Sequence, residues 1–172
     1  MKEVKNSIDD IAPRKTPLWW FWPIVVAVVF LDQLTKSWVL SQFSYGESRV
    51  IIPGFFNLTY VRNDGIAFGL FQGNNVLLGV VVVCILSLGV WYSRRFHWEW
   101  PEVNVVFGLI VGGAIGNLID RVRLSYVVDF FDFNLIIYRW PAFNIADACI
   151  STTVVWLLIR LLFTKVDFIR NP

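Results

Sequence analysis

The sequence has few of the residues on which metal and disulfide chemistry depend. It contains one histidine and two cysteines in 172 residues. The lone histidine, His97, cannot supply the two-His face that zinc peptidases need, so we expect no metal and no other cofactor. Cys84 and Cys149 lie inside apolar runs rather than in loops. This placement argues against a disulfide framework and predicts two small core residues.

Charge is also scarce. Charged residues make up 16% of the chain, and the net charge of +2 is too small and too scattered to indicate nucleic-acid binding. Hydrophobic residues make up 56% of the chain, which is more than a soluble globule of this size could bury on inward faces. The composition therefore predicts an integral membrane protein and excludes a disordered chain or a polar-surfaced soluble enzyme.

Four apolar stretches are long enough to cross a bilayer, which takes about 20 helical residues. They cover approximately residues 18–40, 74–92, 103–119 and 146–164. The first stretch is too long for a secretory signal peptide and lacks a small-residue cleavage site, so we expect it to be retained. The pattern predicts an all-α membrane protein of one domain, residues 1–172, with four transmembrane helices.

The distribution of basic residues predicts how these helices are oriented. With both termini in the cytoplasm, the cytoplasmic ends would carry Lys2, Lys5, Arg14, Lys15, Arg94, Arg95, Lys165 and Arg170. The other side would carry Arg49, Arg62, Arg121, Arg123 and Arg139. Because cytoplasmic loops are enriched in Lys and Arg, we expect both termini inside.

Two connecting segments, 43–73 and 120–145, would then lie outside the cytoplasm. In the first, residues 49–52 and 55–62 are typical of strands joined by the turn-forming pair Pro53-Gly54. In the second, residues 126–138 also have a composition typical of an extended strand and could join the same sheet. We therefore expect a small extracytoplasmic β-hairpin or sheet over the outer end of the helices.

The third apolar stretch carries Gly108, Gly112 and Gly116 at intervals of four residues. Such a stripe of small residues lets a neighbouring helix approach closely. We interpret it as a packing surface with no role in chemistry.

Asp129 and Asp147 are each a lone carboxylate in strongly apolar surroundings. Ionised carboxylates are costly in or near hydrocarbon, so they occur where they meet a partner, line a wet cavity or do chemistry. If the two face each other, repulsion and desolvation raise one pKa, and the pair holds one shared proton at neutral pH. That is the working state of an aspartic protease.

Structural roles are open alternatives for the same two residues. Asn144 and Asp147 have the spacing of a helix N-cap and its third residue, so Asp147 could simply cap the last helix. Asp129 could be a solvent-facing carboxylate paired with Arg121 or Arg123. Asp132, three residues further along an extended segment, would point to the opposite face, and we expect it in water.

Other polar residues have competing structural and functional interpretations. Asp32 and Lys36, four apart on the first helix, are expected to form an ion pair, although Asp32 could instead orient a substrate. Asn63-Asp64-Gly65 has the composition of a turn.

Near the end of the third helix, Asn117, Asp120 and Arg121 fall within about one turn. We expect them to end the helix with a local Asp-Arg pair, or to hold the segment that carries Asp129.

Together these residues resemble the lipoprotein signal peptidase family, signal peptidase II of bacteria, over almost the whole chain. The resemblance rests on five segments in order between the apolar spans. They are Leu31-Asp32-Gln33-Leu34-Thr35-Lys36, Arg62-Asn63-Asp64-Gly65-Ile66-Ala67-Phe68, Gly112-Gly113-Ala114-Ile115-Gly116-Asn117-Leu118-Ile119-Asp120-Arg121, Val127-Val128-Asp129-Phe130 and Trp140-Pro141-Ala142-Phe143-Asn144-Ile145-Ala146-Asp147. Asp64 stands where the family often has Thr.

The resemblance implies an aspartic endopeptidase of the bacterial inner membrane, with its active site near the outer surface. It would remove the signal peptide of a prolipoprotein by cutting before the diacylglyceryl-modified cysteine. Asp129 and Asp147 would be the catalytic pair. The supporting residues would be Asp32, Asn63, Gly65, Asn117, Asp120, Arg121 and Asn144. Membrane lipid and globomycin-type inhibitors are the other expected partners, and a monomer suffices chemically.

Two other functions fit parts of the pattern. A small proton-coupled transporter could relay protons through Asp32 and Asp147, but the second span and the inner half of the third carry no charge. A non-catalytic assembly subunit would retain its activity after Asp129→Asn and Asp147→Asn.

Overall fold

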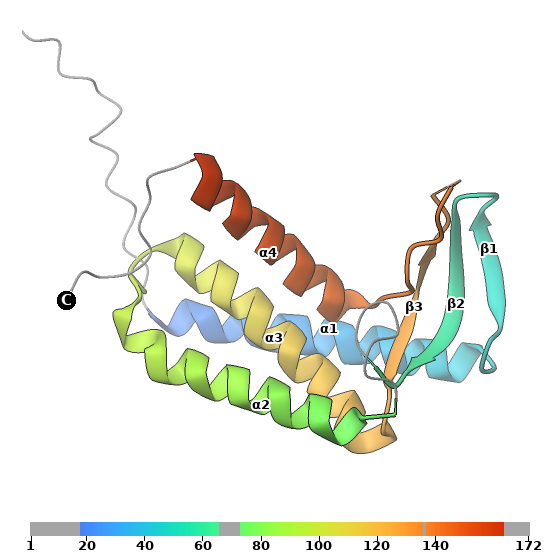
Figure 1. The fold of residues 1–172 in the computed structure, drawn as a ribbon, viewed down its shortest axis with the longest axis horizontal. Coiled ribbons are helices and arrows are strands. Elements are labelled where there is room, and N and C mark those ends of the chain that lie inside the picture. Colours follow the sequence, from blue (N-terminus) through green and yellow to red (C-terminus); the bar gives the residue numbers. More distant parts are fainter. Residues whose placement is uncertain (1–17, 66–72, 136, 164–172) are drawn as a thin grey trace, which may run out of the picture.

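The computed structural model describes residues 18–65, 73–135 and 137–163, which form four long helices and a three-stranded antiparallel sheet. The elements in chain order are η1 (Leu18–Trp20), α1 (Phe21–Gln42), β1 (Ser48–Ile52), β2 (Phe56–Asn63), α2 (Asn75–Tyr92), η3 (Ser93–Arg95), α3 (Pro101–Leu124), β3 (Val127–Phe133) and α4 (Ile145–Phe163). Figure 1 shows the helices as a bundle with the sheet standing across one end.

The four helices are long and apolar enough to cross a membrane, which confirms the predicted spans. Helix α2 is apolar all round, and of its described side chains only Leu78 is buried. A helix of this kind is stable in lipid, which takes the place of a protein core. Cys84 is exposed on α2, so its prediction as a core residue was wrong, and Cys149 is partly buried.

Helix α3 packs closely against α1 through its glycine stripe. A Cβ atom added to Gly108 would lie 2.7 Å from Ile24 Cγ2. One added to Gly112 would lie 2.7 Å from Val28 Cβ. Any larger residue at either position would push the two helices apart, so the packing interpretation of the stripe is confirmed.

Helix α3 extends to Leu124, beyond the predicted end at residue 119. It ends at Ser125, which has a left-handed backbone (φ 66°) and donates its N–H to Arg121 O at 3.1 Å. The charge of Asp120 suggested an earlier end. Asp120 is nevertheless part of the helix, where its side chain is 2% exposed and forms an ion pair with Lys36.

The sheet has the order β1-β2-β3, so the second extended segment does join the sheet of the predicted hairpin. Strands β1 and β2 form the hairpin, whose turn has Gly54 at φ 73°. Strand β3 pairs with β2 and places Asp129 opposite Val61. A hydrophobic cluster joins the sheet to the end of α1, and its buried members are Val39, Phe43, Tyr60, Val128 and Phe130.

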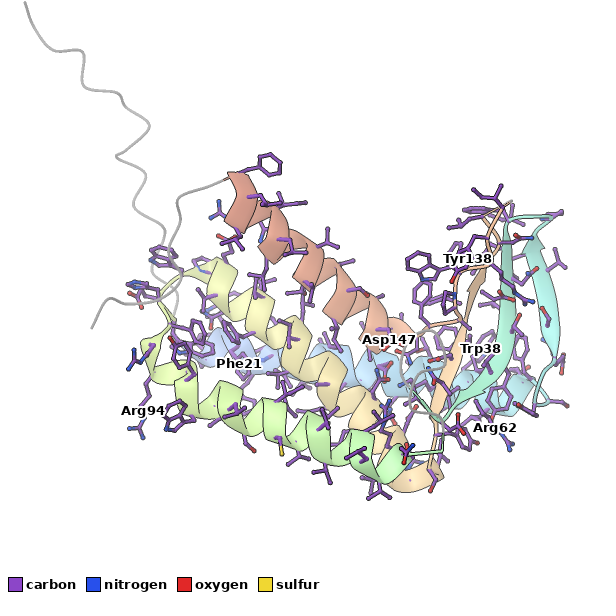
Figure 2. The ribbon with its side chains drawn as sticks, viewed as in Figure 1. Phe21, Trp38, Arg62, Arg94, Tyr138 and Asp147 are labelled. Carbon is purple, nitrogen blue, oxygen red and sulfur yellow. The ribbon has the colours of Figure 1, made fainter. Side chains whose placement is uncertain are left out.

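One end of each of the four long helices lies next to this sheet. The C-terminal ends of α1 and α3 and the N-terminal ends of α2 and α4 all lie at the sheet end of the bundle (Figure 1). In Figure 2, Asp147 lies at this end of α4, whereas Phe21 and Arg94 lie at the opposite end. The fold therefore gathers the polar residues of distant segments into one region.

Candidate active site

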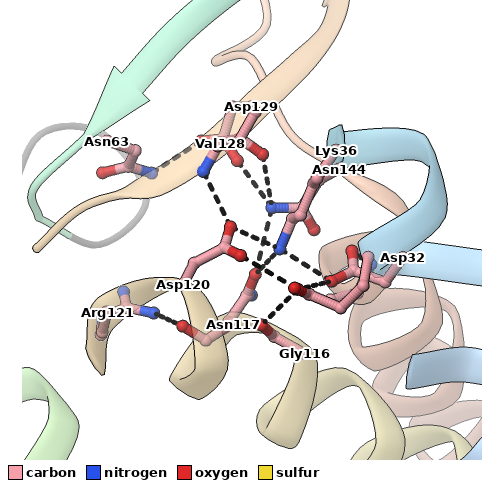
Figure 3. A network of polar contacts seen from close by, with 12 residues as sticks. Asp32, Lys36, Asn63, Gly116, Asn117, Asp120, Arg121, Val128, Asp129 and Asn144 are labelled. Atoms are coloured by element: carbon pink, nitrogen blue, oxygen red, sulfur yellow. Dashed lines mark hydrogen bonds and ion pairs between the residues drawn. The ribbon is translucent and has the colours of Figure 1, made fainter. Parts of the chain in front are cut away.

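Asp129 lies on β3 with its carboxylate directed at two amides. It is 1% exposed. Asn144 Nδ2 donates to its Oδ1 at 2.7 Å, and Asn63 Nδ2, from the end of β2, donates to its Oδ2 at 2.8 Å (Figure 3). Among the described residues these amides, and not Arg121 or Arg123, hold the carboxylate. The alternative of a solvent-facing Asp129 paired with an arginine is therefore wrong.

Asp147 lies in the first turn of α4 and is partly exposed. Its N–H donates to Asn144 Oδ1 at 2.9 Å, and its Oδ2 lies 3.4 Å from Asn144 N. These reciprocal contacts form the capping box that the spacing predicted. Asp147 Oδ1 also accepts a hydrogen bond from Asn117 Nδ2 on α3 at 2.7 Å. Helix capping therefore describes only part of its surroundings.

Asn144 contacts both aspartates. It is fully buried, and its side-chain oxygen caps Asp147 while its side-chain nitrogen reaches Asp129. The same nitrogen lies 3.1 Å from Asn117 Oδ1. One amide thus fixes the position of Asp129 relative to the start of α4.

Asp129 and Asp147 open into the same cavity, which has a volume of about 900 Å³. Near the sheet its wall is polar and includes Asn63, Asn117 and Arg121. Along the helices the wall is apolar, with contributions from Val82, Ile85 and Leu86 of α2, Ile110 and Ala114 of α3 and Ile150 of α4. The cavity can therefore receive an apolar segment whose end reaches the two carboxylates.

Burial, together with the nearby charge of Asp147, raises the pKa of Asp129 to about 8. The hydrogen bonds from Asn63 and Asn144 oppose this shift because they favour the ionised carboxylate. At neutral pH the pair consequently retains one proton, as the sequence predicted for two facing aspartates.

A second polar layer lies beneath the pair. Lys36 Nζ is 2.8 Å from Asp32 Oδ2, which confirms the predicted ion pair. The same nitrogen is 3.0 Å from Asp120 Oδ2 and 2.8 Å from Asn117 Oδ1. A second contributor, Gln33 Nε2, donates to Asp120 Oδ1 at 2.9 Å. Sequence reasoning gave Lys36 one partner and passed over Gln33, although both belong to the segment around Asp32.

Asp32 and Asp120 hold the backbone beside the pair. Asp32 Oδ1 accepts the N–H of Ala146 at 3.0 Å, and Asp120 Oδ2 accepts the N–H of Val128 at 3.0 Å. Gly116 makes room for this, since a Cβ there would lie 2.5 Å from Asp32 Oδ2. Of the two roles predicted for Asp120, the local arginine pair is wrong, and support of the Asp129 segment is confirmed.

Arg121 holds the segment that follows β2. Its Nη2 donates to Gly65 O at 3.1 Å, and its Nη1 lies 3.3 Å from Asn117 O. Its buried Nε has no hydrogen-bond partner among the described residues. The N–H of Gly65 donates to Asn63 Oδ1 at 3.0 Å, which confirms the predicted turn. Residues 66–68 of the same motif lie outside the described residues.

Asp132 is directed away from this site, as the alternation along a strand predicted. Its expected exposure to water is wrong, however, because the side chain is 2% exposed. Asp132 accepts hydrogen bonds from Arg139 and from Thr59, the latter at 2.7 Å. These hydrogen bonds lower the pKa of Asp132, so it is an ionised structural carboxylate.

Comparison with known proteins places this arrangement in a family. Residues 24–163 match the family described as signal peptidase (SPase) II. The lipoprotein signal peptidase of Trichormus variabilis is 44% identical over 149 residues, which cover 86% of this chain and 92% of that protein. That of Shewanella amazonensis is 42% identical over 85% of this chain and 88% of that protein. A solved bacterial membrane enzyme structure matches with a TM-score of 0.79 at 32% identity, over 91% of this chain and 98% of that chain.

Proposed function

This chain belongs to the signal peptidase II family, and we propose that it removes the signal peptide of prolipoproteins as an aspartic endopeptidase. Asp129 and Asp147 are the two catalytic residues of this proposal. The observation that carries it is that both carboxylates line one cavity and both accept from Asn144, Asp129 from its side-chain amide and Asp147 from its backbone N–H.

The reaction begins with one proton on the pair. Asp129 carries it because it is buried and its pKa is raised to about 8, whereas Asp147 is partly exposed. Asp147 takes a proton from a water molecule, and the oxygen of that water bonds to the carbon of the scissile carbonyl. Asp129 gives its proton to the carbonyl oxygen, so the intermediate is a neutral gem-diol.

The intermediate then breaks down with the two roles reversed. Asp147 gives its proton to the nitrogen of the leaving cysteine, and the carbon–nitrogen bond breaks. Asp129 takes a proton from one hydroxyl of the gem-diol, which becomes the carboxylic acid end of the signal peptide. Both aspartates return to their starting protonation states, so no further reactant is required.

The proposed substrate is cut before a cysteine that carries diacylglycerol. Its apolar signal helix would lie along the apolar wall that α2, α3 and α4 give to the cavity, with the acyl chains left in lipid. This proposal includes a bacterial inner-membrane location with both termini cytoplasmic and the pair near the outer surface. Its motivation is that Arg94 lies at the end of the bundle opposite Asp147 (Figure 2), and cytoplasmic loops are enriched in Lys and Arg. Cysteine labelling that found positions 129 and 147 accessible from the cytoplasm would contradict it.

The proton-coupled transporter is not supported. Its relay would need Asp32 to exchange protons with water, but Asp32 is fully buried and both its oxygens are held, one by Lys36 and one by the N–H of Ala146. The relatives are also named as peptidases.

The decisive experiment is a cleavage assay with purified protein, a diacylglyceryl-modified prolipoprotein and a metal chelator. Asp129→Asn or Asp147→Asn should each lower turnover on the order of 10² to 10⁴-fold, because each removes a group that transfers protons. Asp132→Asn is the matched control, since its carboxylate lies on the same strand but faces Arg139. Absence of cleavage by folded native protein would defeat the proposed function. Near-native turnover by either catalytic variant would place the acid and base elsewhere and would leave the non-catalytic subunit as the better account.

A further inference from the structure

Lys36 is a buried cation that the proposed reaction does not use. Its side chain is 2% exposed, and it is not among the residues that line the cavity. A lysine ammonium has three hydrogens to donate. Lys36 Nζ has three acceptors within hydrogen-bond distance, namely Asp32 Oδ2, Asp120 Oδ2 and Asn117 Oδ1 (Figure 3). Its donor capacity is therefore fully used inside the protein.

Two of these acceptors lead to the two catalytic segments. Asp120 accepts the backbone N–H of Val128, the residue before Asp129. Asp32 accepts the backbone N–H of Ala146, the residue before Asp147. Asp120 belongs to α3 and Asp32 to α1, and Lys36 forms an ion pair with both. The residue before each catalytic aspartate is thus two interactions from the same ammonium group.

The third acceptor gives a side-chain route to the same pair. Asn117 Oδ1 accepts from Lys36 at 2.8 Å, and Asn117 Nδ2 donates to Asp147 Oδ1 at 2.7 Å. The bond from Lys36 fixes which end of the Asn117 amide faces Asp147, because Nζ can only donate. Asn117 must therefore offer a donor to the carboxylate of Asp147.

The two carboxylates bonded to Lys36 need its positive charge. Asp32 and Asp120 are 0% and 2% exposed, and both lie beside Lys36 Nζ. Two buried carboxylates so close together need a cation between them. The charged groups that face this cluster are Asp129 and Asp147 above it and Arg121 on α3, which is nearer the catalytic pair. Lys36 is the cation with direct bonds to both buried carboxylates.

We infer that Lys36 is a positioning residue for the catalytic pair, holding the segments that carry Asp129 and Asp147 in a fixed relative geometry through Asp120, Asp32 and Asn117. This inference rests on the proposed function, because its effect appears in the cleavage reaction. Lys36 does not contact the cavity, so its loss should lower kcat and leave KM near the native value.

The test uses full-length protein in detergent and the same prolipoprotein assay. Lys36→Met keeps most of the side-chain volume and removes the charge and the donors. Because this variant leaves two buried carboxylates without their cation, a second variant, Lys36→Met with Asp120→Asn, keeps the net charge of the cluster at its native value. Arg123→Met is the control for loss of a positive charge, since Arg123 is exposed at the same end of α3.

We expect Lys36→Met to lower both the melting temperature and kcat, the latter on the order of 100-fold, as a small misplacement of catalytic groups does. The double variant should recover most of the melting temperature and retain the loss of kcat. Arg123→Met should match the native chain in both. Recovery of kcat together with melting temperature in the double variant would overturn the inference, as would native kcat in folded Lys36→Met. Cleavage by the native chain in the same assay separates this failure from failure of the proposed function.

Discussion

Asn144 caps α4 and binds Asp129 with the same side-chain amide. Its Oδ1 accepts the N–H of Asp147 at 2.9 Å, while its Nδ2 donates to Asp129 Oδ1 at 2.7 Å. The relationship joins a local feature, a helix start, to a contact between residues 15 positions apart. A substitution at this position can therefore separate helix capping from support of the proposed catalytic pair.

Asn144→Ser should retain the cap and lose the contact with Asp129. A serine hydroxyl is a good N-cap acceptor, so we expect the melting temperature to stay close to that of the native protein. The shorter side chain does not reach Asp129, and turnover should fall on the order of 100-fold because the carboxyl loses its orientation. Asn144→Ala should lose the cap as well, at a cost of about 1 kcal/mol. Native turnover in Asn144→Ser would show that the amide has no part in the reaction.

The pH dependence of cleavage should report the shared proton. Since the pKa of Asp129 is raised to about 8 by burial and by the charge of Asp147, the pair loses its proton as the pH rises through that value. We predict that kcat/KM falls on the alkaline side with a midpoint near this pKa, a value that belongs to the pair as a whole. Rates measured from pH 5 to 10 test this. A rate that stays constant to pH 10 would contradict the requirement for a protonated carboxyl.

Stability should depend on pH through the same residue. The pKa of Asp129 in the folded protein, about 8, lies above its ordinary value of 3.8. Between these values the folded state binds more protons than the unfolded state, so the free energy of unfolding should fall as the pH rises from about 4 to about 8. Asp129→Asn cannot ionise and should lack this component. Thermal unfolding of both proteins at pH 5 and pH 9 is the measurement, and equal pH dependence would contradict the shift.

Most of the fold could be predicted because it follows from local patterns. Apolar length gave the four spans, the glycine stripe gave the close approach of α3, and Pro53-Gly54 gave the hairpin. The end of α3 was misjudged because charge at Asp120 suggests a helix terminus. That reasoning assumes exposure, and exposure depends on where Lys36 lies in the folded protein, 84 residues earlier in the chain.

The sequence predicted which residues belong to the site better than it predicted the contacts between them. Lone carboxylates in apolar surroundings identified Asp129 and Asp147 as candidates before any geometry was known. Spacing along α1 predicted one partner of Lys36, Asp32. The other two, Asp120 and Asn117, come from α3, and no sequence spacing reports a contact between distant helices. Asp132 was placed in water for a similar reason, because its partners Arg139 and Thr59 are brought to it by the sheet.

The contact between α1 and α3 offers a test that is independent of catalysis. Gly112→Ala would place a Cβ 2.7 Å from Val28 Cβ and 3.2 Å from Val25 O, closer than real Cβ contacts. The helices must separate to accommodate it, and overpacking of this kind typically costs about 1–3 kcal/mol. We expect a lower melting temperature and lower turnover, since α1 carries Asp32 and Lys36 and α3 carries Asn117.

Gly89→Ala is the matched control for that substitution. Gly89 also lies inside a helix, α2, and a Cβ added there meets nothing within 4 Å in the structure. Alanine is favoured over glycine in a helix by about 1 kcal/mol, so this variant should be as stable as the native protein or more so. Equal effects of the two substitutions would mean that loss of backbone freedom, and not the approach of α1 to α3, explains the glycine stripe. A large loss of stability and turnover in Gly112→Ala alone would show that close helix packing holds the second polar layer in place beside the proposed catalytic pair.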